Sequence, residues 1–302
     1  MANNNSKRKN RTNYPLILAT VLTTAAVAGA IFLVLTALGH NDTHISDEYS
    51  NTPNQSAVSE STESKNNGSS LSEPDNSGID ETSQSYEEYI GVEYAIDITE
   101  WEQYIEPENA DAYLILVNKT HPLASDYVPA NMVDVVYTRK DGRATQKMVY
   151  TAEKALQAFL LEAAEYGVTD VTVTSAYRSY SKQSEIFNDN VNKNLSKFAT
   201  LEECEEYVST FSARPGTSEH QTGLVCDMHN LSSAGAAFGN TPEAKWLAQN
   251  AHRFGFIMRY AEDKTDITRI IYEPWHFRYV GRKAATEMYL SNLCLEEYLE
   301  NR

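Results

Sequence analysis

An uncharged apolar run near the start of the chain divides the sequence into parts that cannot fold in the same way. The run extends over 15–39 (PLILATVLTTAAVAGAIFLVLTALG) and follows a basic cluster of Lys7, Arg8, Lys9 and Arg11. As a helix at ~1.5 Å per residue, these residues would extend about 37 Å, enough to cross a bilayer of ~30 Å. We therefore expect a transmembrane signal anchor at 15–39, a cytoplasmic tail at 1–14, and all later residues outside the cytoplasm.

Two alternatives to a retained anchor fit the same run. A cleaved signal peptide usually has a shorter apolar region of about 7–15 residues, although Ala37-Leu38-Gly39 could serve as a cleavage site. A buried core helix is disfavoured because a polar tract follows directly. The length of the run favours the anchor, and cleavage stays open as an alternative.

Residues 40–90 have the composition of a disordered linker. Within them, 41–88 is rich in Ser, Asn, Thr, Asp and Glu, and Lys65 is its only Lys or Arg. Such a segment cannot bury enough apolar surface to offset the conformational entropy that ordering costs. We expect either a spacer of roughly 40 Å that holds a domain off the membrane, or a simple linker between unrelated parts.

The charge and the cysteines exclude two classes of protein. The chain has 42 acidic and 25 basic residues and a formal net charge of -17. No nucleic-acid partner is expected, because binding phosphates relies on Lys and Arg. Three cysteines are too few for a disulfide scaffold, and pairing of Cys204 with Cys294 stays open. Cys226 is expected in the core, and the oligomeric state does not follow from the sequence.

Aromatic residues and hydrophobic periodicity return at about residue 91, and we expect one folded domain over 91–302. Apolar residues at helical spacing predict helices at 151–166, 180–194, 201–210, 242–254 and 281–299. Runs rich in β-branched residues predict strands at 133–139, 170–177, 223–228, 256–260 and 267–273. Because these elements are interleaved without regular βαβ repetition, they indicate an α+β domain with a small, mainly antiparallel sheet.

One stretch of this domain, RPGTSEHQTGLVCDM (214–228), has residues suited to binding a metal. His220 lies seven positions before Asp227, which ends a predicted short strand. Gly216 and Gly223 would let the backbone bend around a bound ion. Taken singly, a histidine before a glycine turn and an aspartate at a strand end are more often structural residues.

A second stretch, YEPWHFRYVG (272–281), adds Glu273 three positions before His276. Two imidazoles and one carboxylate form a zinc triad that leaves a fourth position open for water. A further carboxylate beside the triad can take the proton of that water. The remaining histidines of the domain are expected to fix a loop, to point away from the site, or to pack in a helix: His121, His229 and His252.

A third stretch, TSAYRSYSKQ (174–183), places Arg178 directly after a predicted strand. A guanidinium can bind a carboxylate through two parallel hydrogen bonds, or stabilise a developing oxyanion. On its own, an arginine in this position would more often form a surface salt bridge.

Taken together, the three stretches resemble the VanY-type D-alanyl-D-alanine carboxypeptidases, zinc peptidases that trim bacterial peptidoglycan stems. The resemblance covers about 114–300 and also includes LVNKTHPL (116–123) and FGNTPEAKWLAQNAHRFGFIMRY (238–260). It implies the fold shared by the Hedgehog signalling domain and the D-Ala-D-Ala peptidases. Two departures are Val225-Cys226, where the family often has Ala-Val, and Ala261, where it often has Pro. The second leaves the preferred peptide open.

The resemblance also implies roles for individual residues. One zinc ion per chain would be bound by three ligands, His220, Asp227 and His276. Glu273 would be the catalytic base, and Arg178 would bind the terminal carboxylate of the substrate or the oxyanion. Further substrate contacts are expected from residues around these stretches, with the last two forming apolar walls or belonging to the core: Gln183, Ser218, Tyr177, Tyr260 and Trp275.

The expected function is therefore removal of the C-terminal D-alanine from peptidoglycan stem peptides by a serine-independent zinc metallopeptidase. It would act at the outer face of a bacterial cell membrane, held there by a single-pass anchor, in cell wall remodelling or glycopeptide resistance. Two alternatives are an L,D-carboxypeptidase acting on tetrapeptide stems and a non-catalytic, zinc-bearing wall-binding module. The presence of both Glu273 and Arg178 argues against the second, because a pure binder needs neither.

Overall fold

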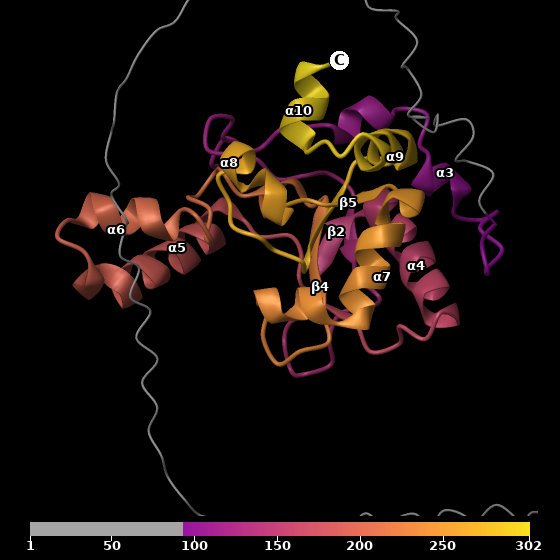
Figure 1. The fold of residues 1–302 in the computed structure, drawn as a ribbon, viewed down its shortest axis with the longest axis horizontal. Helices are drawn as coiled ribbons and strands as arrows, with labels where there is room; N and C mark the ends of the chain where they lie inside the picture. Colours follow the sequence, from indigo (N-terminus) through magenta and orange to yellow (C-terminus); the bar gives the residue numbers. More distant parts are fainter. Residues whose placement is uncertain (1–92) are drawn as a thin grey trace, which may run out of the picture. The chain divides into compact units, whose positions relative to one another are not determined.

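The computed structural model describes residues 93–302 (Figure 1). They contain a four-stranded antiparallel sheet with the strand order β3-β4-β6-β5. A separate two-stranded antiparallel sheet pairs β1 with β2. The predicted α+β class with a small antiparallel sheet is confirmed. The strands are β1 (Met132–Asp134), β2 (Lys147–Val149), β3 (Thr172–Ser175), β4 (Val225–His229), β5 (Phe256–Met258) and β6 (His276–Tyr279).

The predicted tail (1–14) and anchor (15–39), and the linker predicted over 40–90, lie outside the described residues. Between residues 93 and 302, no helix combines the length and the apolar character that crossing a bilayer requires.

The helices gather into groups around the sheet. Helices α5 and α6 pack on each other and stand apart from α4 and α7 (Figure 1). The α-helices are α3 (Glu102–Ile105), α4 (Tyr150–Glu165), α5 (Tyr180–Asn194), α6 (Leu201–Val208), α7 (Pro242–Asn250), α8 (Thr265–Thr268), α9 (Arg282–Leu290) and α10 (Leu295–Glu300). The 3-10 turns are η1 (Ala110–Tyr113), η2 (Leu195–Lys197), η3 (Glu219–Thr222), η4 (Ala236–Asn240), η5 (Ala251–Phe254) and η6 (Glu262–Lys264).

Two of the predicted elements are wrong, and a left-handed residue explains each. The stretch predicted as a strand at 267–273 begins inside α8, which ends at Thr268 because the next residue, Arg269, takes φ 60°. The single helix predicted at 281–299 is instead α9 and α10, because Asn292 takes φ 48° between them. Left-handed backbone of this kind continues neither a helix nor a strand. Of the strand predicted at 133–139, the first part belongs to β1, and the rest contributes only an isolated bridge between Thr138 and Val173.

A core of aromatic side chains holds the strands that carry the site. The ring of Phe159, from α4, stacks on Phe254 at 5.3 Å and on Phe256 at 6.0 Å between centroids, and meets the edge of Phe277 from β6. All four rings are fully buried. Burying a phenylalanine side chain contributes about 1.5–3 kcal/mol, so this cluster fixes β5 and β6 against α4.

The cysteines are core residues. Cys226 lies in the same core as Phe277, its partner across β4 and β6, as predicted. Cys204 is buried in a smaller cluster with Phe187, Cys294 is buried elsewhere, and both are free thiols. The open question of a Cys204–Cys294 disulfide is therefore answered in the negative.

Candidate active site

The central pair of strands brings together two residues that lie far apart in the sequence. In the register of β4 and β6, Asp227 is directly opposite His276. Residues opposite each other in an antiparallel pair have side chains on the same face, whereas their neighbours Cys226 and Phe277 face the core. The sheet thus presents a carboxylate and an imidazole side by side on one face.

His220 reaches the same place from η3, just before β4. Its Nδ1 donates a hydrogen bond to the carbonyl of Ala176, with 2.6 Å between the two atoms. The turn ends at Gly223, whose φ of 69° is left-handed, and a Cβ there would lie 3.1 Å from the side chain of Pro129. Gly216, before the turn, is also left-handed at 86°. The predicted need for two glycines around His220 is confirmed.

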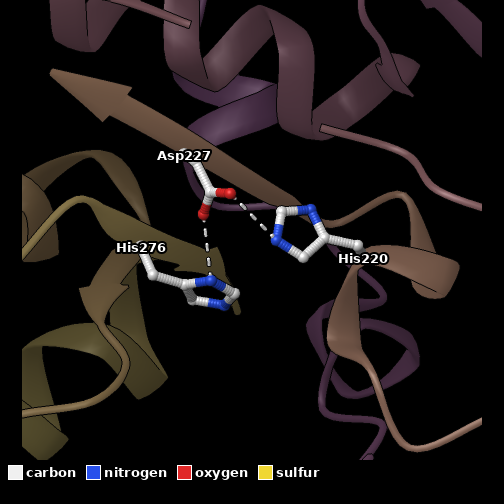
Figure 2. Close-up of side chains that lie close together, drawn as sticks. All are labelled: His220, Asp227 and His276. Atoms are coloured by element: carbon white, nitrogen blue, oxygen red, sulfur yellow. Dashed lines mark ion pairs between the residues drawn. The ribbon is translucent and has the colours of Figure 1, made fainter. Parts of the chain in front are cut away.

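Figure 2 shows the resulting triad, with the two oxygens of Asp227 directed at the two imidazoles. Asp227 Oδ2 lies 3.3 Å from His220 Nε2, and Oδ1 lies 3.1 Å from His276 Nδ1. One potential ligand atom from each residue lies within 4.8 Å of the others. The structure therefore brings together the three residues predicted to bind a metal.

The hydrogen bonds behind the triad show that a divalent cation fits it. Because the carbonyl of Ala176 can only accept, Nδ1 of His220 carries the hydrogen and Nε2 has a lone pair facing Asp227. Both His220 Nε2 and Asp227 Oδ1 are buried and form no hydrogen bond within the described residues. Buried lone pairs that face one another need a cation between them, and two histidines with one carboxylate are a ligand set of catalytic zinc.

Burial and charge set the protonation of the triad in the absence of an ion. Burial, and then Arg178, lowers the pKa of His220 to about 4, so its ring is neutral at pH 7. For Asp227, burial opposes ionisation, but His220 and His276 outweigh it and keep the pKa below its usual range. For His276, burial is outweighed by the adjacent carboxylates of Asp227 and Glu219, which raise the pKa to about 9. A proton on His276 thus takes the place of the cation.

Glu273 lies at the edge of the triad. Its backbone N–H donates to the carbonyl of Tyr260 (3.0 Å) and its own carbonyl accepts from the N–H of His276 (3.1 Å). Its Oε2 is 3.6 Å from His276 Nδ1. Burial raises the pKa of Glu273 to about 8, against the opposing effect of His276. A carboxyl group whose pKa lies near the working pH is suited to general acid–base catalysis.

Arg178 is fixed between β3 and α5. Its N–H donates to the carbonyl of His220 (3.1 Å), and the next residue, Ser179, caps α5 by accepting from the N–H of Lys182 (3.2 Å). Arg178 Nε is buried without a hydrogen bond, and the guanidinium forms no ion pair within the part of the chain that the structure describes. It is therefore available to an anionic ligand.

These groups line one cavity of about 180 Å³. Gln183 donates from Nε2 to the carbonyl of Ala213 (2.6 Å), which leaves its buried Oε1 without a hydrogen bond among the described residues. The ring of Tyr260 lies 4.7 Å from that of His276. The predicted residues that line the cavity are Arg178, Gln183, Ser218, His220, Asp227, Tyr260, Glu273, Trp275 and His276.

Tyr177 is not among the lining residues, so its substrate contact stays a prediction. A larger cavity of about 340 Å³, with a mainly apolar lining from α7, β5 and α9, contains none of the predicted site residues. The other histidines are placed as expected: His121 bonds to the side chain of Asn118 within its loop, His229 contacts Phe238, and His252 stacks on Tyr289.

Sequence reasoning missed two sets of residues around the site. Helix α5 contributes Ile186 and Asn190 to the cavity lining, and the turn that follows α6 contributes Phe211. Glu219 lies directly behind His276 and is almost fully buried. The only sequence signal for Glu219 is its place next to His220, and buried acids are too rare for sequence alone to suggest them.

Comparison with known proteins agrees with this geometry. A family model described as VanY, D-alanyl-D-alanine carboxypeptidase, matches residues 145–282. A protein of Bacillus subtilis (strain 168), named as a carboxypeptidase, YodJ, is 33% identical over 288 residues, which are 94% of this chain and 95% of that protein.

Two solved structures share the fold. The LdcB LD-carboxypeptidase is 37% identical with a TM-score of 0.56, over 64% of this chain and 88% of that one. A mutant of the vancomycin resistance D,D-pentapeptidase VanY, in complex with Zn(II), is 38% identical with a TM-score of 0.52, over 62% of this chain and 98% of that one. With its matching family model and a 33% identical relative aligned over nearly its whole length, the chain belongs to the VanY family of D-alanyl-D-alanine carboxypeptidases.

Proposed function

We propose that this protein is a zinc-dependent carboxypeptidase that removes the C-terminal D-alanine from peptidoglycan stem peptides. The observation that carries the proposal is the meeting of the His220–Asp227–His276 triad, Glu273 and Arg178 in one cavity. A zinc ion bound by the triad supplies Lewis-acid polarisation of a peptide carbonyl and makes water more acidic. The zinc complex of the related D,D-pentapeptidase supports both the metal and the substrate class.

Arg178 selects for the end of a peptide. Its guanidinium has no ion pair among the described residues and borders the cavity, so it can bind the terminal carboxylate of a substrate. The cavity of about 180 Å³ is below the ~300–1,000 Å³ of sites for drug-sized ligands. A small terminal residue such as D-alanine suits this volume, and the carboxylate contact makes the enzyme an exopeptidase.

Glu273 moves the proton of the reaction. Its carboxylate, beside His276 Nδ1 and within the cavity, takes a proton from the attacking water and delivers it to the nitrogen of the departing D-alanine. The peptide C–N bond breaks, and the products are a free amino acid and a shortened stem with a new carboxylate. Gln183 Oε1 would accept a hydrogen bond from the peptide, and the Ser218 hydroxyl would accept or donate one, between walls formed by Tyr260 and Trp275.

A second candidate is hydrolysis of tetrapeptide stems, between an L and a D residue. The likeness to the LdcB LD-carboxypeptidase favours it. The family model and the D,D-pentapeptidase favour the D,D reaction, which we place first.

Synthetic stem peptides test both candidates. The purified protein is incubated with penta- and tetrapeptide stems, with and without a chelator, and the products are weighed by mass spectrometry. Loss of one alanine from the pentapeptide, abolished by chelator and restored by zinc, is expected. Loss from the tetrapeptide alone would assign the L,D reaction, and intact peptides with zinc-loaded protein would reject the proposal.

We also propose that the domain works outside the cytoplasmic membrane, held by residues 15–39. The support is the length of that apolar run and the basic residues before it. Cell fractionation tests this location: full-length chain in the membrane fraction supports the anchor. A shorter soluble chain lacking the first 39 residues would support cleavage.

A further inference from the structure

A buried carboxylate lies behind the triad, on the side of His276 that faces away from Asp227. Glu219 Oε2 is 3.4 Å from His276 Nε2, while Asp227 Oδ1 is 3.1 Å from the other ring nitrogen, Nδ1. The side chain of Glu219 has no exposed surface. The imidazole of His276 is thus held at both nitrogens by acidic groups from different parts of the chain.

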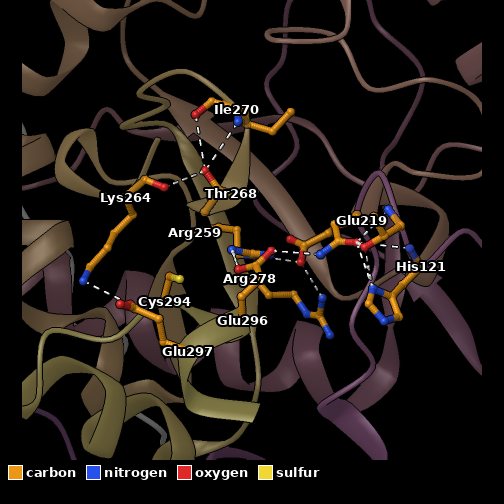
Figure 3. A network of polar contacts seen from close by, with 12 residues as sticks. His121, Glu219, Arg259, Lys264, Thr268, Ile270, Arg278, Cys294, Glu296 and Glu297 are labelled. Carbon is orange, nitrogen blue, oxygen red and sulfur yellow. Dashed lines mark hydrogen bonds and ion pairs between the residues drawn. The ribbon is translucent and has the colours of Figure 1, made fainter. Parts of the chain in front are cut away.

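Two arginines hold this carboxylate in place (Figure 3). Glu219 Oε1 accepts from Arg259 Nε and from Arg278 Nη1, each at 2.8 Å. Two positively charged guanidinium groups that both donate to one carboxyl oxygen favour the ionised form of that carboxyl group. Glu219 is therefore a carboxylate, which can only accept hydrogen bonds.

The arginines are themselves fixed. Arg259 makes a bidentate pair with Glu296 of α10, at 2.7 and 2.8 Å, and its backbone N–H donates to the carbonyl of His276. Arg278 Nη2 donates to the carbonyls of Tyr113 and Ile115, at 2.9 and 2.8 Å. Two buried glutamates thus balance two buried arginines.

A network of buried ion pairs is expected to add little net free energy to the stability of a fold. Desolvation of buried ion pairs can exceed their attraction, and apolar side chains of similar volume often stabilise a protein as well or better. A positional role accounts better for four buried charges directly behind His276. Carboxylates that accept from the outer nitrogen of a metal-binding histidine fix the orientation and tautomer of its ring.

We propose that Glu219 is a positioning residue that holds His276 with the hydrogen on Nε2, so that the lone pair of Nδ1 faces the metal site. This inference rests on the proposed metal site. The carbonyl of Ala176 does the same for His220 through the opposite nitrogen. Both rings therefore present a lone pair toward Asp227. Arg259 and Arg278 keep Glu219 ionised and hold its carboxylate next to His276 Nε2.

The variant Glu219→Gln reverses this arrangement with little change of shape. The two arginines, which only donate, retain the amide oxygen and turn the amide NH₂ toward His276. A donor at that position favours the tautomer with the hydrogen on Nδ1, which blocks the ligand atom. We expect zinc affinity to fall by about 10- to 100-fold, the usual cost of losing such a partner.

Zinc affinity is measured by competition with a chromophoric chelator, and the ring of His276 is followed by ¹⁵N NMR of histidine-labelled protein. The matched control is Glu296→Gln, which removes a charge from the same network without touching His276. At a pH above the pKa of the His276 ring, where the ring is neutral, we expect Nε2–H in the metal-free wild type and control. At the same pH we expect Nδ1–H in metal-free Glu219→Gln. If Glu219→Gln does not fold, Glu219→Asp is tested by the same two measurements. This variant keeps the negative charge, but its shorter side chain places the carboxylate farther from His276.

Wild-type zinc affinity with an unchanged Nε2–H signal in the folded Glu219 variant would overturn the proposal. An equal loss of affinity in Glu296→Gln would also overturn it, because the effect would then belong to the stability of the network. Failure of the proposed function is distinguishable from both. In that case the wild type would show the expected zinc affinity and tautomer but release no alanine from any stem peptide.

Discussion

Asp227 and His276 are cross-strand partners, one on β4 and the other on β6. Their separation is therefore set by the hydrogen bonds of the sheet, and the aromatic core beneath it holds both strands. His220 is different, because it reaches the triad from a 3-10 turn between two left-handed glycines. Two of the proposed ligands are thus part of the rigid frame, and the third is on a turn that the hydrogen bond to Ala176 fixes in place.

Replacing Glu273 by Gln should leave zinc bound and lower turnover by about 10²-fold or more, because positioned general bases contribute on that scale. Zinc content and release of alanine from a pentapeptide stem are measured on the same sample. Glu202→Gln, on the exposed face of α6, is the control and should behave as wild type. Near-normal turnover in Glu273→Gln would remove this residue from the mechanism.

Replacing His220 by Ala should abolish stoichiometric zinc binding, because only two of the three proposed protein ligands would remain. Metal content after dialysis, measured by atomic absorption, checks this. His121→Ala is a matched control, since that ring is exposed and bonds only within its own loop. One zinc per chain in purified His220→Ala would refute the ligand assignment.

Replacing Arg178 by Ala should harm substrates with a free terminal carboxylate far more than amidated ones. A hydrogen bond to a charged group contributes about 1.5–3 kcal/mol, which corresponds to roughly 10- to 100-fold in kcat/KM. The wild type and the variant are compared on the same stem peptide in its acid and amide forms. An equal loss on both forms would indicate that Arg178 supports the fold of the cavity and not the carboxylate.

Zinc affinity should depend on pH through His276. In the metal-free protein the pKa of this ring is raised to about 9, so Nδ1 carries a proton at neutral pH that the ion must displace. Apparent affinity should therefore rise about tenfold per pH unit up to pH 9 and then level off. Calorimetry in buffers of different ionisation enthalpy counts the protons released.

Glu273 complicates that count, because burial raises its pKa to about 8 and it also holds a proton at pH 7. The same titration on Glu273→Gln isolates His276. About one proton released per zinc at pH 7 in this variant is expected. No release would show that the ring is already neutral and that the cation site is not blocked by a proton.

The elements with strong periodicity were predictable. Helices α4 and α5 lie where the spacing of apolar residues places them, within a residue at each end. The stretch 267–273 was wrongly predicted as a strand because its β-branched residues favour one. In the structure the backbone N–H of Ile271 donates to the carbonyl of Thr210, and no strand forms there. No sequence pattern reports the left-handed backbone at Arg269 and Asn292 that ends one element and divides another.

At the site, the groups that meet the cavity were predictable and the groups behind them were not. His220, Asp227, Glu273 and His276 are residue types whose chemistry is visible in the sequence, and the family resemblance joined the motifs. Glu219 belongs to a residue type that is normally solvated, and its burial depends on arginines 40 and 59 positions away in the chain. The ion pairs that allow Glu219 to be buried form only in the folded chain, so the sequence does not reveal them.

The pairing of Arg259 with Glu296 has a consequence for biogenesis. Glu296 belongs to α10, so the support behind His276 is incomplete until residue 296 has been synthesised and has joined the fold. A nascent chain that has delivered all three proposed ligands still lacks the residue that anchors Arg259. During synthesis α10 is therefore the last part of this network to be made, and the cavity side of the site can be complete while Arg259 still lacks its bidentate partner.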